Sequence, residues 1–213
     1  MTGVVDVYFS FRSPYSYLAA PYLEPLRRDF DVAVNLRVVL PLAVRQPDFF
    51  SPENMKRAGY ILIDVLRRAE MLGIPINWPK PDPIVQDLET GKIAAEQPHI
   101  HRLSALGVEA QRRGKGIEFA REVSAIIFGG VEGWDQGDHL AQAAGRAGLD
   151  LAEMEAALQG GDHAAEIDAN QKALEEAKHW GVPTLVFEGE PFFGQDRIDT
   201  LRWRLEKVGL KRG

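Results

Sequence analysis

The stretch FSFRSPYSYLA, residues 9–19, joins a predicted first strand directly to a predicted first helix. Residues 4–9 are β-branched and aromatic with few polar side chains, which is typical of a buried strand. Ser13 followed by Pro14 fits an N-cap and a first-turn proline. Unpaired helix amides and the positive end of the helix dipole then meet near the Ser13 hydroxyl, where an anion could bind. The alternative is that Ser13 only starts a helix, as we predict for the Ser-Pro pair at residues 51–52, which has no predicted strand before it.

The hydrophobic spacing after this junction predicts a β-α-β unit followed by a long helical insertion. A helix is predicted over residues 14–30 and a second strand over residues 32–40, which Pro41 ends. The helices predicted in the insertion cover residues 51–72, 99–113, 116–128, 138–147, 150–158 and 163–179. Repeated prolines interrupt the segment 75–98, which we expect to form a lid or a partner surface.

The C-terminal part predicts two strands and a final helix. Residues 180–187, WGVPTLVF, are typical of a loop that enters a strand with Pro183 at its first position, and we predict a cis peptide bond between Val182 and Pro183. Residues 188–197 predict a tight turn, a short strand and a loop that runs into a last helix capped by Asp196. The chain therefore has the order β-α-β, helical insertion, β-β-α.

Three motifs carry a resemblance to a known family: SPYSYLA (residues 13–19), GVPT (181–184) and FGQDR (193–197). They resemble those of the 2-hydroxychromene-2-carboxylate isomerase family and of its relatives, the kappa-class glutathione transferases. The resemblance implies an α/β protein with a thioredoxin fold and a large all-helical insertion, the architecture of the disulfide oxidoreductases. It implies a discontinuous thioredoxin-like domain at residues 1–48 and 178–213, and a helical insertion domain at residues 49–177.

The resemblance also implies a glutathione site. In the family, the serine that matches Ser13 hydrogen-bonds the glutathione sulfur. The N–H of the residue that matches Val182, just before Pro183, pairs with the cysteinyl backbone of the tripeptide, as β-augmentation would predict. The glutamyl end would reach four residues of the last motif, Phe193, Gly194, Gln195 and Asp196, where a carboxylate can pair with its ammonium group.

Arg45 and Asn54 follow the second strand, where the isomerases place residues that meet the substrate carboxylate. Arg45 stands where the family commonly carries lysine, and the alternative is an arginine in water. Arg12 stands at a position that is usually apolar in the family. It either adds charge near the thiolate or turns outward.

Composition excludes several classes of function. The chain has no cysteine, and Ser13 and Ser16 occupy the positions of a redox Cys-x-x-Cys motif, so it cannot itself exchange disulfides. A net charge of −6 and a pI near 5.4 argue against a nucleic-acid partner.

Apolar runs are too short to span a membrane and no secretory signal is visible, so we expect a cytoplasmic protein. His99 and His101 would point to different sides of a helix, which argues against a metal site.

The resemblance implies a glutathione-dependent isomerase acting on a small aromatic 2-oxo acid. The thiolate would add to the conjugated system, rotation or ring opening would follow, and elimination would return glutathione unchanged. One alternative is a kappa-like transferase or peroxidase, which would consume glutathione. Another is a non-catalytic thioredoxin-fold binding protein. A homodimer is expected, because dimers are common in the family.

Overall fold

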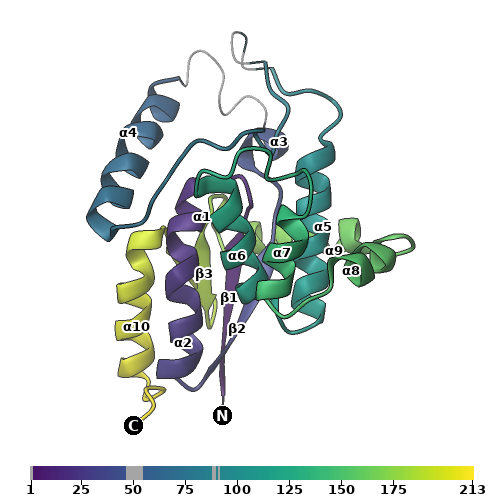
Figure 1. Ribbon diagram of the computed structural model, residues 1–213. Coiled ribbons are helices and arrows are strands. Elements are labelled where there is room, and N and C mark those ends of the chain that lie inside the picture. Colours follow the sequence, from purple (N-terminus) through teal and green to yellow (C-terminus); the bar gives the residue numbers. More distant parts are fainter. Residues whose placement is uncertain (1, 47–54, 88–89, 91) are drawn as a thin grey trace.

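The computed structural model describes residues 2–46, 55–87, 90 and 92–213 (Figure 1). Its four-stranded sheet has the order β2-β1-β3-β4, with β1 and β2 parallel and β3 antiparallel to both of its neighbours. The strands are β1 (Gly3–Phe9), β2 (Val32–Val38), β3 (Thr184–Phe187) and β4 (Glu190–Phe193). Strands from the two ends of the chain thus lie side by side, and the predicted α/β class and thioredoxin fold are confirmed.

The helices cover the sheet from both sides. They are α1 (Pro14–Ala19), η1 (Ala20–Tyr22), α2 (Leu23–Asp29), α3 (Leu42–Arg45), α4 (Met55–Leu72), α5 (Pro98–Arg112), α6 (Gly116–Phe128), α7 (His139–Arg146), α8 (Leu151–Leu158), α9 (His163–Glu176), η4 (Gln195–Arg197) and α10 (Ile198–Lys207). In Figure 1, α1, α2 and α10 lie on one side of the sheet, and α5, α8 and α9 lie on the other. None of the helices in the described ranges is long and apolar enough to cross a membrane.

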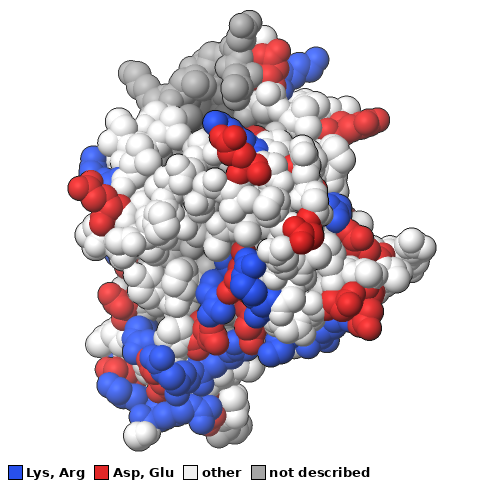
Figure 2. Space-filling model, in the orientation of Figure 1, with Lys and Arg blue, Asp and Glu red and all other residues white. Residues whose placement is uncertain are grey.

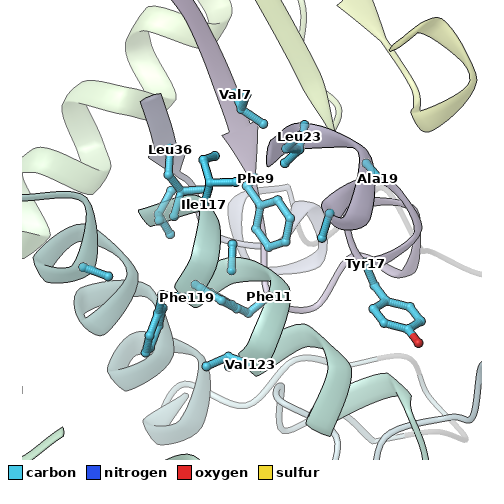
Figure 3. Close-up of a cluster of buried hydrophobic side chains, with 14 of the residues drawn as sticks. Val7, Phe9, Phe11, Tyr17, Ala19, Leu23, Leu36, Ile117, Phe119 and Val123 are labelled. Atoms are coloured by element: carbon cyan, nitrogen blue, oxygen red, sulfur yellow. The ribbon is translucent and has the colours of Figure 1, made fainter. Parts of the chain in front are cut away.

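One continuous hydrophobic core joins the sheet to the helical insertion (Figure 3). Phe11 is fully buried and makes edge contacts with Phe9 at 5.4 Å and with Phe119 of α6 at 5.9 Å between ring centroids. At Gly107 of α5 a Cβ atom would lie only 2.7 Å from the Phe11 ring, so glycine allows this helix to approach. The core crosses the predicted boundaries at residues 48 and 178, which stay predictions.

The predicted helix over residues 14–30 is broken, because α1 ends at Ala19 and the 3-10 turn η1 precedes α2. Pro21 has no N–H to donate to the residue-17 carbonyl, and its ring would collide with that carbonyl in a regular helix. The predicted second strand over residues 32–40 was too long, because β2 ends at Val38. The prediction also missed α3, whose N-cap is Pro41. The predicted helix start at residues 51–52 lies outside the described residues.

Two further details of the prediction were wrong at the C-terminal side. Asp196 does not cap the last helix: α10 begins at Ile198, after the turn η4, with no side-chain cap bond. The helix predicted through His179 ends at Glu176, because Lys178 adopts a left-handed conformation with φ 62°. The prediction of a cis peptide bond between Val182 and Pro183 is confirmed.

Candidate functional site

Ser13 lies at the carboxyl end of β1, where the chain turns into α1. Its hydroxyl oxygen accepts the Ser16 N–H at 3.2 Å, so Ser13 is the N-cap of α1 as predicted. The same hydroxyl donates to the Val182 carbonyl at 3.4 Å. This is long for an O–H···O bond, so the proton can turn to a better acceptor. Ser16 is fully buried, and within the described residues its hydroxyl has no hydrogen-bond partner.

The loop with the cis bond brings Val182 and Pro183 next to Ser13. No hydrogen bond among the described residues uses the Val182 N–H. A backbone donor next to the Ser13 hydroxyl is therefore available to an extended peptide. The Pro183 carbonyl accepts the Gly194 N–H at 2.9 Å, which joins this loop to the turn after β4.

The turn over Gly194, Gln195 and Asp196 forms the third side of the site. Gly194 has φ 108°, a conformation that other residues rarely adopt, and a Cβ there would lie 2.5 Å from an Asp196 carboxylate oxygen. Gln195 is buried and accepts a hydrogen bond from the Arg68 guanidinium at 3.1 Å. The Asp196 side chain is 45% exposed and lies 3.3 Å from the Arg197 guanidinium. Its carboxylate is thus held at the surface, where it can meet a cation.

Helix α4 adds side chains that the sequence analysis did not place in the site. The Tyr15 hydroxyl donates to Asp64 at 2.7 Å, and burial together with this carboxylate raises the pKa of Tyr15. The Tyr60 hydroxyl also donates to Asp64, at 3.4 Å. The charge of Asp196 contributes to the raised pKa of Tyr15. Tyr15 therefore stays protonated between the two carboxylates.

Arg45 lies at the end of α3 and fastens the cis-proline loop to it. Its Nε donates to the Leu40 carbonyl and its Nη2 to the Trp180 carbonyl, both at 2.8 Å. Burial lowers its pKa. No carboxylate of the described residues lies within 4.0 Å of this guanidinium. Asn54, the other predicted substrate ligand, lies outside the described residues.

Arg12 does not turn outward, so that expectation was wrong, while an effect of its charge on a thiolate stays a prediction. Its Nε and Nη2 donate to the two carboxylate oxygens of Asp82 at 2.6 and 2.8 Å. The two side chains are 16% and 25% exposed, and the pair is formally neutral. The guanidinium carbon also lies 4.6 Å from the centre of the Trp78 ring. The loop before Ser13 is thus tied to the proline-rich segment.

An aromatic cluster borders the other side of the cis-proline loop. The Phe193 ring stacks on His179 at 4.1 Å between centroids, and His179 stacks on Trp180 at 5.5 Å. The His179 Nδ1 accepts the Gly181 N–H at 3.0 Å, and burial lowers the pKa of His179. A Cβ at Gly181 would lie 2.5 Å from the Phe193 ring, so glycine permits this packing. Phe193 itself remains 42% exposed.

The motifs found in the sequence thus lie together in the structure. The sequence gives no signal for the residues that support them. One hydrogen bond joins Ser13 to Val182, and a second joins the next residue, Pro183, to Gly194. Asp82 and Trp78 lie in a segment without regular spacing, so nothing in the sequence pairs them with Arg12. In the described part of the chain, no three histidine or acidic side chains are placed to hold a metal ion.

Residues 4–206 match the family model of the DSBA-like thioredoxin domain. The chain belongs to this family. It is 25% identical over 199 residues to the 2-hydroxychromene-2-carboxylate isomerase of Pseudomonas putida, covering 92% of this chain and 90% of that protein. The enzyme of the same name from Sphingobium xenophagum is 26% identical over 211 residues, covering 94% and 97%.

Solved structures share the same fold. A 2-hydroxychromene-2-carboxylate isomerase superposes with a TM-score of 0.71 at 23% identity, covering 96% of this chain and 95% of that one. The cytosolic disulfide reductase DsbM from Pseudomonas aeruginosa with GSH superposes with a TM-score of 0.57 at 16% identity, covering 95% and 99%. At these sequence identities, the superpositions show that the chains share a fold.

Proposed function

We propose that this protein is a glutathione-dependent isomerase of an aromatic 2-oxo acid, of the 2-hydroxychromene-2-carboxylate type. The names of its relatives support the reaction. The observation that carries the glutathione part is the juxtaposition of the Ser13 hydroxyl and an unused Val182 N–H, beside the turn that holds Asp196. A serine in place of a redox cysteine supplies no thiolate, so a sulfur nucleophile would come from a bound molecule.

The residues present fit the tripeptide. The Val182 N–H would pair with the cysteinyl backbone, and the Ser13 hydroxyl would turn from the Val182 carbonyl to hydrogen-bond the sulfur. Asp196 would pair with the glutamyl ammonium, while Gln195 and Gly194 shape the turn and Phe193 and Pro183 border it. When bound, glutathione would supply a thiolate that adds reversibly to the conjugated acceptor and leaves again. The role of Ser13 is to stabilise negative charge on that sulfur both before addition and after elimination.

Arg45 is proposed to meet the acceptor carboxylate. Two of its nitrogens are held by main-chain carbonyls, and no hydrogen bond among the described residues uses its Nη1. A positioned cation with one free edge suits a carboxylate. Asn54 is proposed to contact the same carboxylate, and this proposal rests on the family resemblance alone.

The test follows thiol and substrate together. With 2-hydroxychromene-2-carboxylate and glutathione, the substrate's absorbance should change while total free thiol stays constant. Loss of thiol in step with product would contradict the isomerase and favour a transferase. A change in neither would favour a binding protein. Omitting glutathione, or replacing it with S-methylglutathione, should abolish turnover.

A cytoplasmic homodimer is proposed on the resemblance to the isomerases. Helix α4 supports the dimer, because Leu62, Ile63 and Leu66 are 46%, 59% and 60% exposed on neighbouring turns. A second copy would remove this apolar surface from water. Sedimentation should show a dimer for the wild type and a monomer for Leu66→Glu. A monomeric wild type would contradict the proposal.

A further inference from the structure

Trp78 presents a large aromatic surface in the proline-rich segment beside the Ser13 loop. The residue is 46% exposed, although the Arg12 guanidinium lies 4.6 Å from its ring centre. Because the guanidinium covers one face of the indole, the exposed part belongs to its other face and its edges. Burial of an aromatic ring of this size is favourable, so an open indole face is a ready surface for an apolar ligand.

The support beneath the indole is rigid. The Arg12 guanidinium is fixed by the two parallel hydrogen bonds to Asp82, and Asp82 also accepts the Ile84 N–H at 3.0 Å. A bidentate pair of this kind defines the plane of the guanidinium. The indole therefore rests on a cation whose orientation is set before any ligand arrives.

The backbone on each side of Trp78 is fixed to the helical insertion. The Asn77 N–H donates to the Phe128 carbonyl at the end of α6 at 2.7 Å. The Lys80 carbonyl accepts the Gly133 N–H at 2.8 Å. The Pro81 carbonyl accepts the Trp134 indole N–H at 2.7 Å. In Figure 1 this segment runs from the end of α4 past α1, where the Tyr17 hydroxyl donates to the Pro75 carbonyl at 2.6 Å. Because these hydrogen bonds already hold the segment in one conformation, ligand binding would not lose entropy in ordering it.

We propose that Trp78 is the platform on which the planar ring of the acceptor stacks, with Arg12 and Asp82 as the residues that position it. The proposal rests on the proposed function, because the residue that supports the indole, Arg12, directly precedes Ser13. Since the Arg12–Asp82 pair is formally neutral, the platform selects an uncharged aromatic ring and leaves the carboxylate to another part of the site.

Trp203 offers a matched control. It is 51% exposed and lies near two cations, with Arg204 at 5.0 Å and Lys207 at 5.2 Å from its ring centre. It lies in α10, whose carboxyl end is beside the amino end of β1, at the opposite end of the sheet from Ser13 (Figure 1). Trp203 thus matches Trp78 in residue type, exposure and cation contact but not in place.

The experiment measures equilibrium binding of freshly dissolved phenylpyruvate, an aromatic 2-oxo acid, by calorimetry without glutathione. Trp78→Ala should raise the Kd about tenfold, while Trp78→Phe, which keeps a ring that can stack, should stay within about threefold of the wild type. Trp203→Ala should leave the Kd unchanged. Binding of pyruvate, which has no ring, should not respond to Trp78→Ala. Circular dichroism confirms that each variant is folded.

Equal Kd values for Trp78→Ala and the wild type would overturn the proposal, and so would an equal loss in Trp203→Ala. Loss of binding in folded Trp78→Phe as great as in Trp78→Ala, or no saturable binding by the wild type, would overturn it as well. Because neither glutathione nor turnover enters this measurement, its failure is distinguishable from failure of the thiol test of the isomerase.

Discussion

Replacing Ser13 with alanine separates its role as a helix cap from its role in binding sulfur. The variant loses the bond from the Ser16 N–H to the hydroxyl, which is 3.2 Å long. Loss of an N-cap typically costs about 1 kcal/mol of unfolding free energy. The 3.4 Å contact with the Val182 carbonyl adds little to this, because it is long.

The same substitution should affect catalysis more than stability. A hydrogen bond to a charged group contributes about 1.5–3 kcal/mol, so kcat/KM should fall by roughly 10- to 150-fold. The assay follows turnover of 2-hydroxychromene-2-carboxylate with glutathione, alongside urea unfolding of each variant. The fold should stay intact, since the core around Phe11 does not involve the hydroxyl.

Asp150→Ala is the matched control, because Asp150 caps α8 by accepting the Glu153 N–H at 3.0 Å. It should lose a similar amount of stability and keep full activity. Activity of Ser13→Ala within about twofold of the wild type would refute the reasoning and leave Ser13 as a cap only. An equal loss of activity in Asp150→Ala would trace the effect to stability instead.

Three further outcomes are expected. Gly194→Ala should raise the KM for glutathione, because a Cβ would lie 2.5 Å from an Asp196 oxygen and the backbone has φ 108°; an unchanged KM and melting temperature would contradict this. Arg45→Lys should raise the KM for the acceptor, and it should also raise the KM for glutathione because it releases the Trp180 carbonyl. If steady-state kinetics show neither KM changed, Arg45 is not part of the site. Hydrogen bonds from two arginines lower the pKa of Asp29 to about 2 from 3.8, so this carboxylate should stabilise the fold above pH 3.8 and lose that effect as the pH falls through about 2. Urea unfolding at several pH values should show a weaker acid dependence for Asp29→Asn, and identical profiles would argue against the interaction.

The meeting of the three motifs could be predicted because each borders a regular strand. Ser13 follows β1, and Val182 and Gly194 flank β3 and β4, which pair next to β1. Once the sheet order is known, the ends of neighbouring strands must lie together. The strand pattern therefore brought together the residues that the resemblance assigns to glutathione.

The other half could not be predicted, since it depends on contacts between distant irregular segments. Arg12 pairs with Asp82 seventy positions away, and the segment around Asp82 has no helical or strand period. The predicted helix boundaries were wrong where one residue was compatible with two local structures. Pro21 could have begun a turn or interrupted a helix, and Asp196 could have capped α10 or belonged to the turn before it.

The most direct test of the account is a titration of the glutathione thiol in complex with the protein, followed by the ultraviolet absorbance of the thiolate. We predict that the pKa of the bound thiol lies below that of free glutathione, because the Ser13 hydroxyl donates a hydrogen bond to the charged form. Ser13→Ala should return the pKa most of the way to the free value, while Asp150→Ala should leave it lowered. A bound thiol that titrates like free glutathione in the wild type would contradict the claim that Ser13 stabilises a glutathione thiolate.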